Sequence, residues 1–167
     1  DVPHKFGIGG LHGAIDNYFG EGYFLMADVA SYYPAMMIEY DYLSRNVADK
    51  TRFKRIRDER IIMKANNDKR QQPRKIVLNS TYGASKDQYN NLYDPLQANH
   101  VCILGQLLLT DLIEKLEGKC QLIQSNTDGL IVKLHGNEKE VIAICKEWEE
   151  RTGMGLGYDR IRKICQK

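Results

Sequence analysis

The stretch 122–134 most constrains the fold, because two apolar arms meet there at a short polar tip. After the tip, aliphatic residues recur at every second position from Leu130 to Leu134, which is the period of a half-buried strand. The tip reads Asn126-Thr127-Asp128-Gly129, and Asp-Gly is a strong hairpin-turn signal. We therefore predict a β-hairpin that presents Asp128. The Asp128 carboxylate either serves only to form the turn or also belongs to a metal-binding site. A second carboxylate at the end of another buried strand, close enough to share a metal ion, would favour the metal-binding site.

Asp28 supplies that second carboxylate. The segment Tyr23–Val29 reads as a buried strand with Asp28 at its end, and Pro34 then turns the chain. Two carboxylates at adjacent strand ends repel each other unless a cation lies between them, and oxygen ligands favour Mg²⁺ or Mn²⁺ over zinc. A pair of such ions suits phosphoryl or nucleotidyl transfer.

The order of predicted elements indicates an α+β fold. Helical periodicity predicts helices over 35–43 and 49–66, a helix that Pro73 opens at its first position and Gly83 loosens, and a long helix over 96–117. After the hairpin we predict a helix capped by Asn137 with Glu140 and closed by Gly153, and a strand over 158–165. With the basic helices set aside, this order predicts an antiparallel split βαβ (ferredoxin-like) sheet. In that plan the first strand lies beside the central hairpin, which brings Asp28 and Asp128 together.

The opening of the chain is rich in glycine. Six of the fourteen glycines fall between Gly7 and Gly22. We predict a loop here with close backbone approach. It is not a dinucleotide-binding fingerprint, because His12 replaces the third glycine and no strand precedes it.

Charge is concentrated in one segment. The segment 45–75 has twelve Lys or Arg and four Asp or Glu, a net charge of +8, whereas the whole chain carries +2. Such a run is either a solvated helix face or a surface that meets phosphates. Arg60 and Lys64 lie one turn apart on the first of its helices, and Lys75 and Asn79 share a face of the second.

Length and cysteine content indicate the class of protein. The 167 residues suit about one domain, and the four cysteines never reach CxxC spacing. We expect reduced core cysteines in a cytoplasmic protein. No unbroken apolar run reaches the roughly 18 residues of a membrane span, so we expect no membrane contact. Because the chain does not begin with methionine, we expect it to be a piece of a longer protein.

Three segments resemble the motifs of family B DNA polymerases. Asp28-Val29-Ala30-Ser31-Tyr32-Tyr33-Pro34 resembles motif A, DxxSLYPS, and Asn126-Thr127-Asp128-Gly129 resembles motif C, DTDS. The segment 75–83, KIVLNSTYG, matches motif B, KxxxNSxYG, at every defined position. Their order and spacing are also similar to those of the family. The glycine-rich opening resembles the segment of phage polymerases that joins the exonuclease domain to the palm and touches template.

The resemblance implies a domain plan and a reaction. Residues 1–44 and 84–167 would form the polymerase palm, and 45–83 a two-helix fingers insertion. The chain would add deoxynucleoside triphosphates to the 3′-hydroxyl of a primer–template DNA, with two Mg²⁺ ions or Mn²⁺ in their place. If phage-encoded, it would work in the bacterial host cytoplasm. The exonuclease and thumb would lie outside this chain, so we expect weak or undetectable synthesis by the chain alone.

The resemblance also implies residue roles. Asp28, Asp128 and the Val29 carbonyl would hold the metals, and Tyr33 would be the steric gate against a 2′-hydroxyl. The incoming triphosphate would be bound by Lys75 and Asn79, with Arg60 and Lys64, or alternatively Arg57, from the partner helix. Tyr82 and Gly83 would line the nascent base pair.

Departures from the family pattern leave alternatives open. Asn126 replaces the first aspartate of motif C, and Gly129 replaces its serine. A non-catalytic nucleic-acid-binding palm, in which Asn126 marks decay, is therefore the competing hypothesis. A cyclase-like nucleotidyl transferase on the same sheet plan would have no reason to carry the motif at 75–83.

Overall fold

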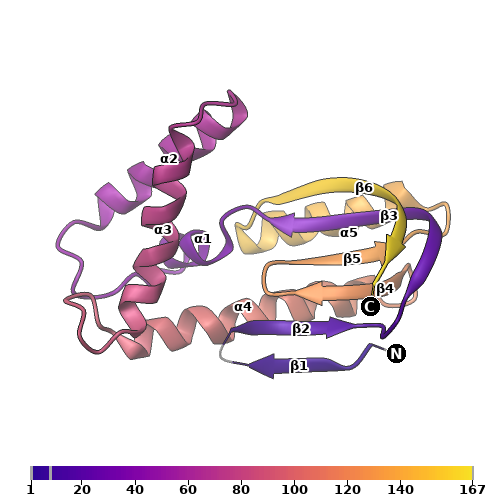
Figure 1. Ribbon diagram of the computed structural model, residues 1–167, viewed down its shortest axis with the longest axis horizontal. Coiled ribbons are helices and arrows are strands. Elements are labelled where there is room, and N and C mark those ends of the chain that lie inside the picture. Colours follow the sequence, from indigo (N-terminus) through magenta and orange to yellow (C-terminus); the bar gives the residue numbers. More distant parts are fainter. Residues whose placement is uncertain (1, 8, 167) are drawn as a thin grey trace. The chain divides into compact units, whose positions relative to one another are not determined.

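The computed structural model describes residues 2–7 and 9–166, and within them the chain is an α+β protein with one antiparallel sheet and five helices (Figure 1). It divides into two compact units, residues 1–32 with 102–167 and residues 33–101. In chain order the elements are β1 His4–Gly7, β2 Gly10–Ala14, β3 Phe19–Val29, α1 Tyr32–Glu39, α2 Lys50–Ala65, α3 Gln71–Lys86, α4 Pro95–Leu116, β4 Gln121–Asn126, β5 Gly129–Lys133, α5 Glu138–Thr152 and β6 Leu156–Cys165.

The first unit contains the sheet, whose described strands lie in the order β1-β2-β4-β5-β3-β6. All five pairings are antiparallel. The predicted adjacency of the first long strand and the central hairpin is confirmed, because β3 pairs with β5 from Phe24↔Lys133 to Asp28↔Gly129. This pairing joins segments that are far apart in the sequence.

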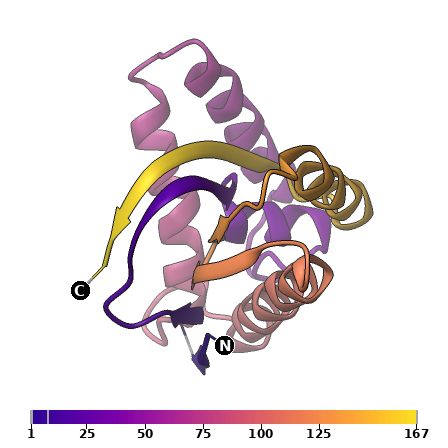
Figure 2. The same cartoon turned by 90° about the vertical axis from the view of Figure 1, so that its right-hand side faces the viewer.

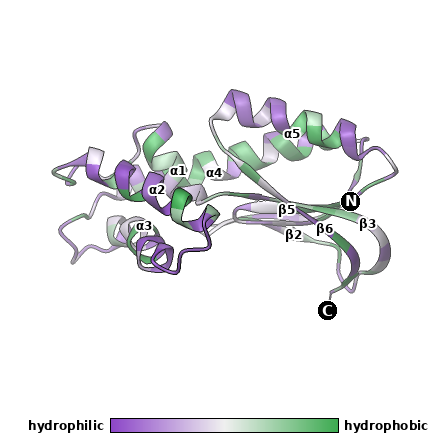
Figure 3. Cartoon of the chain, turned by 90° about the horizontal axis from the view of Figure 1, so that it is seen from above, coloured by the Kyte–Doolittle hydropathy of each residue, from purple (hydrophilic) through white to green (hydrophobic). Residues whose placement is uncertain are grey.

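Helices cover one face of this sheet. In Figures 2 and 3, α5 and the part of α4 from Cys102 onward lie on the same side of it. Trp148 of α5 is fully buried and donates its indole N–H to the Leu108 carbonyl of α4 at 3.0 Å. The residues of β3 that face inward, Leu25, Ala27 and Val29, are at most 2% exposed. Alternate residues such as Asp28 therefore point to the opposite face of the sheet.

The second unit is built around the basic helices α2 and α3. Asp49, the first residue of the predicted helix 49–66, is the N-cap of α2, since its carboxylate accepts from the amides of Thr51 and Arg52. Arg74 of α3 forms an ion pair with Glu59 of α2 at 2.8 Å, which joins the two helices. The unit contains the predicted segment 45–83 together with α1 and the start of α4.

The glycine-rich opening was predicted as a loop, and that prediction is wrong. It forms the β1–β2 hairpin, and β2 continues the sheet beside β4 through Gly13↔Ser125 and Ala14↔Gln124. A β-carbon on Gly13 would lie 2.9 Å from the Pro3 carbonyl oxygen. The glycine therefore permits close approach between the paired strands rather than a break in them.

Three local predictions need smaller corrections. The first helix begins at Tyr32 and ends at Glu39, before the predicted 35–43 span is complete. Pro73 is the third residue of α3, a position whose missing N–H also has no intrahelical acceptor. Asn137 is the N-cap residue of α5, but its side chain caps no helix amide, and its Oδ1 accepts instead from the His135 amide.

The cysteines and α4 bear on the expected class of protein. All four cysteines are free, but Cys165 is exposed at the end of the edge strand β6, so it is not the core residue we predicted. By length and composition α4 could cross a membrane, with a mean hydropathy of 1.2 in its most apolar window. Core helices pass the same test, and Leu109, Leu112 and Leu116 of α4 are buried. The expected absence of membrane contact stays a prediction.

Candidate functional site

A main-chain hydrogen bond joins the end of β3 to the turn after β4. Asp28 is the second-last residue of β3, and it pairs in the sheet with Gly129, the first residue of β5. The Val29 amide donates to the main-chain carbonyl of Asp128 at 2.7 Å. Asp28 is exposed, whereas Val29 is 2% exposed. The two aspartates that the sequence predicted to be neighbours thus lie at adjoining strand ends.

Asp28 has a glycine opposite it on each neighbouring strand, Gly129 on β5 and Gly157 on β6. A β-carbon on Gly129 would lie 2.6 Å from the Ala27 carbonyl oxygen and 2.9 Å from Asp28 Oδ1, which is too close for either atom. A β-carbon on Gly157 would meet the Asp28 carbonyl oxygen at 3.7 Å, an ordinary contact. The Asp28 carboxylate therefore reaches over Gly129, and the residue directly opposite it on each neighbouring strand has no side chain.

The loop between β4 and β5 consists of Thr127 and Asp128. Its flanking residues, Asn126 and Gly129, are register partners, so the loop lies one residue earlier than the Asp-Gly signal indicates. Asn126 Oδ1 accepts from the Thr127 amide at 2.9 Å, which holds the tip. Within the described part of the chain, no side chain or amide donates to the Asp128 carboxylate. The predicted hairpin presenting Asp128 is confirmed.

Apolar Met26, Leu130 and Ile131 line one cavity of about 240 Å³ together with four polar residues, Asp28, Gln124, Asn126 and Asp128. All four side chains carry oxygen donors, which are the ligands that Mg²⁺ and Mn²⁺ prefer. Among the described residues no group of three or more His, Cys, Asp or Glu side chains is placed to hold a metal. A site with two carboxylates fits Mg²⁺, because this ion commonly binds through one or two carboxylates and completes its shell with water and substrate phosphate.

The second unit brings two of the predicted site residues together. The rings of Tyr33 in α1 and Tyr82 in α3 lie 4.4 Å apart between centroids, at an interplanar angle of 45°. Lys86 Nζ lies 4.5 Å from the centre of the Tyr82 ring. Tyr82 is 9% exposed, so its ring belongs mostly to the packing of this unit. The contact joins the predicted steric gate to a residue of the motif at 75–83.

Helix α3 turns the other predicted residues outward. Its buried side is formed by Leu78, Tyr82 and Ser85. Lys75, Asn79 and Gly83 are exposed. A β-carbon on Gly83 would meet nothing within 4 Å. This face of α3 therefore exposes the ammonium group of Lys75, the side-chain amide of Asn79 and the main chain at Gly83.

The predicted cations of α2 differ in their exposure. Lys64 is exposed, whereas Arg60 is 7% exposed, and burial lowers the pKa of its guanidinium. Arg57, the alternative cation, forms ion pairs with Glu39 at 3.1 Å and with Asp58 at 3.4 Å. Of the three predicted α2 cations, Lys64 is the one that is exposed.

Sequence reasoning missed Gln124 and Gly157 as parts of the carboxylate site. Gln124 could have been found, because it lies two residues before Asn126 and so shares its face of the strand. The position of Gly157 depends on the register between β3 and β6, which no short-range pattern in the sequence encodes.

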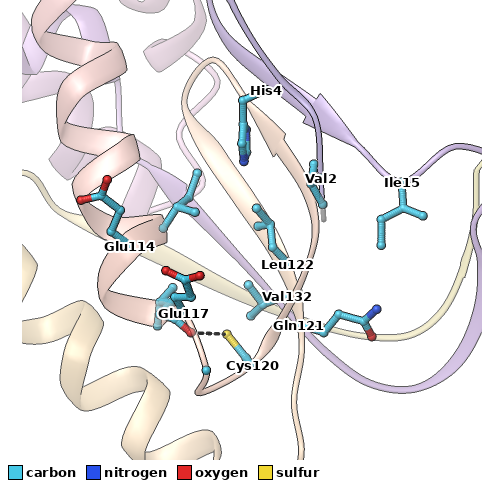
Figure 4. Close-up of a pocket in the computed structure, with 12 residues that line it drawn as sticks. Val2, His4, Ile15, Glu114, Glu117, Cys120, Gln121, Leu122 and Val132 are labelled. Atoms are coloured by element: carbon cyan, nitrogen blue, oxygen red, sulfur yellow. Dashed lines mark hydrogen bonds between the residues drawn. The ribbon is translucent and has the colours of Figure 1, made fainter.

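A second cavity lies beside the C-terminal end of α4 (Figure 4) and contains none of the predicted site residues. Its volume is about 340 Å³, and its lining is largely apolar with Glu114 and Glu117 among the polar groups. Cys120 also lines it, and burial raises the pKa of that thiol to about 11. The thiol is thus not poised as a nucleophile.

Comparison with known proteins adds no assignment to this geometry. No protein-family model matches the chain, and no curated protein matches it.

Proposed function

We propose that this chain is the palm and fingers portion of a phage-like family B DNA polymerase, which adds deoxynucleotides to a primer 3′-hydroxyl. One observation carries the proposal. Asp28 and Asp128 are separated by 99 residues in the sequence, yet their strand ends are joined by the 2.7 Å hydrogen bond from the Val29 amide to the Asp128 carbonyl. Each of the two lies within a segment that resembles a motif of that family, and the two line one cavity.

The residues of the first unit would bind divalent ions. Asp28 and Asp128 would supply carboxylate oxygens, and Val29 its main-chain carbonyl. Two bound Mg²⁺ ions would lower the pKa of the primer hydroxyl and stabilise charge on the leaving phosphate oxygens. The chain's own contribution is to fix the two aspartates at adjoining strand ends and, through Gly129 and Gly157, to place no side chain directly opposite Asp28 on either neighbouring strand.

The residues of the second unit would bind the incoming nucleotide. Lys75 and Lys64 are exposed cations suited to triphosphate oxygens, and Asn79 can donate through its amide. Tyr33 would exclude a 2′-hydroxyl by contact with the sugar, and its position is supported by the ring of Tyr82. Arg60 would contribute only if α2 exposes it, and it is therefore the weaker assignment.

Metal binding gives the first test. Mn²⁺ is titrated into the parent chain and followed by electron paramagnetic resonance. Asp28→Asn and Asp128→Asn are each expected to weaken binding about tenfold or more, since each removes a charged oxygen ligand. Asp159→Asn is the matched control, because Asp159 is an exposed carboxylate opposite Met26 on the same sheet. Equal loss in all three variants would mean that Mn²⁺ responds only to net charge.

Single-nucleotide extension gives the second test. A primer–template duplex is mixed with excess protein, Mn²⁺ and one deoxynucleoside triphosphate. We expect slow addition by the parent and none by Asp128→Asn. Extension by Asp128→Asn at the parent's rate would refute the metal role. Processive synthesis by the 167 residues would contradict the expected weakness of synthesis by this chain alone.

One observation favours a second candidate, a non-catalytic nucleic-acid-binding palm. Asn126 lines the cavity at the position of the first aspartate of motif C and brings no charge to it. If both the parent and Asn126→Asp bind primer–template DNA but neither extends it, this second function is preferred.

A further inference from the structure

We propose that the β1–β2 hairpin is a positioning element that fixes the Thr127–Asp128 loop, with Thr127 as the positioning residue. The inference rests on the proposed function, in which Asp128 is a metal ligand. It assigns a task to the glycine-rich opening that is distinct from any contact with template. It is carried by contacts at both the tip and the stem of the hairpin.

The first contact is made by the Thr127 hydroxyl. Thr127 Oγ1 lies 3.1 Å from the Gly9 carbonyl oxygen and 3.3 Å from His12 Nε2. A carbonyl can only accept, so the hydroxyl donates its single proton to Gly9. His12 must then donate from Nε2, which fixes its protonation on that nitrogen. Thr127 thus bridges Gly9 in the turn of the hairpin and His12 on β2.

The second contact is steric. A β-carbon on Gly10 would lie 2.8 Å from Thr127 Cγ2 and 3.2 Å from Thr127 Cα, and Gly10 has φ of +123°. Only glycine suits both the backbone angle and the space. The Thr127 side chain therefore packs directly on the Gly10 main chain, so the start of β2 contacts the Thr127–Asp128 loop.

The hairpin itself is held in place from two directions. At its tip, the Gly7 carbonyl accepts from Gln106 Nε2 and from Cys102 Sγ of α4. At its stem, β2 pairs with β4 at Gly13↔Ser125, and His4 Nδ1 lies 3.2 Å from Ser125 Oγ. A support tied to both a core helix and the sheet resists movement better than the half-buried two-residue loop that it touches.

The consequence concerns Asp128. A two-residue loop has few internal restraints, and Thr127 precedes Asp128 directly. Holding the Thr127 side chain restricts the backbone angles that aim the Asp128 carboxylate into the cavity. Binding of a cation then orders fewer groups, which favours affinity.

The test compares Thr127→Val, which keeps the shape but removes the hydroxyl, with Thr127→Ser, which keeps the hydroxyl. Thr110→Val is the matched control, because its hydroxyl bonds a helix carbonyl, that of Gln106, at 2.8 Å. Two quantities are measured, the hydrogen-exchange rate of the peptide covering 124–130 and the Mn²⁺ dissociation constant. For Thr127→Val we expect both to rise about three- to tenfold, which corresponds to one lost hydrogen bond. Thr127→Ser and Thr110→Val should match the parent.

The outcomes separate this inference from the proposed function. Unchanged exchange in Thr127→Val would overturn the positioning role, whatever the metal does. Faster exchange with unchanged Mn²⁺ affinity would overturn the link to Asp128. A parent chain that binds no Mn²⁺ would refute the proposed metal site and with it the link to Asp128, while exchange would still decide whether the hairpin fixes the loop.

Discussion

Substitution of Gly129 by alanine gives the sharpest test of the site geometry. The added β-carbon would lie 2.6 Å from a main-chain oxygen, that of Ala27, and 2.9 Å from Asp28 Oδ1. The first atom belongs to a central strand and cannot rotate away, so β3 and β5 must separate by several tenths of an ångström. Overpacking of this kind costs about 1–3 kcal/mol. For a chain of this size each kcal/mol lowers the melting temperature by about 2–4 °C.

The protein supplies both the probe and the control. Trp148 is the only tryptophan in the sequence, and it is fully buried in the unit that holds the site. Its fluorescence therefore follows the unfolding of that unit. Gly157→Ala places a methyl group on the other side of Asp28, where the nearest atom is 3.7 Å away. We expect Gly157→Ala to change the free energy of unfolding by less than about 1 kcal/mol.

Mn²⁺ affinity should fall in Gly129→Ala, because the new methyl group occupies the position over which the Asp28 carboxylate lies. Affinity in Gly157→Ala should stay within about twofold of the parent, because that substitution creates no close contact with the carboxylate. Equal stability and equal affinity in the two variants would refute the argument that close approach over Gly129 shapes the site.

Two further predictions concern side chains outside the carboxylate site. Hydrogen bonds from Arg45 hold the pKa of buried Asp94 below its usual range, so this carboxylate stabilises the fold above about pH 4 and loses that effect as pH falls further. Asp94→Asn should therefore cost about 1–2 kcal/mol at pH 7 and less below pH 4, as followed by far-UV circular dichroism. Asp68→Asn, which removes a half-buried carboxylate paired with exposed Arg70, should cost less. Burial raises the pKa of the Cys145 thiol to about 11, whereas Cys165 is exposed. Iodoacetamide at pH 8 should therefore alkylate Cys165 before Cys145, as followed by mass spectrometry. In guanidinium, which unfolds the chain, the two cysteines should be alkylated at similar rates.

Much of the first unit follows from short-range patterns in the sequence. The apolar alternation after Asp128 and the buried run before Asp28 predicted the two strands, and the split βαβ order predicted that β3 and β5 would pair. Glycine content misled the prediction for the opening, because the sequence does not reveal that β2 would find a partner in β4. A glycine within a paired strand lets the neighbouring backbone approach closely, whereas a glycine in a segment with no partner strand favours a loop. Glycine content alone does not distinguish the two cases.

The parts that could not be predicted depend on register and burial. Whether a cation on a helix faces solvent depends on how α2 and α3 pack, which is why Arg60 is buried while Lys64, one turn later, is exposed. The glycines opposite Asp28 likewise acquire their role only from the alignment of β3 with β5 and β6.

The two departures from motif C have local structural reasons, and these bear on the choice between the proposed functions. Asn126 and Gly129 form one cross-strand pair that frames the Thr127–Asp128 loop. The asparagine oxygen holds the Thr127 amide, and the family's serine at Gly129 would place a β-carbon 2.6 Å from the Ala27 carbonyl. A decaying site would be expected to lose close packing around its carboxylates, because nothing would then maintain it. Here Asn126 holds the loop and Gly129 preserves the space of Asp28, and this retained packing favours the proposed metal site over a vestigial one.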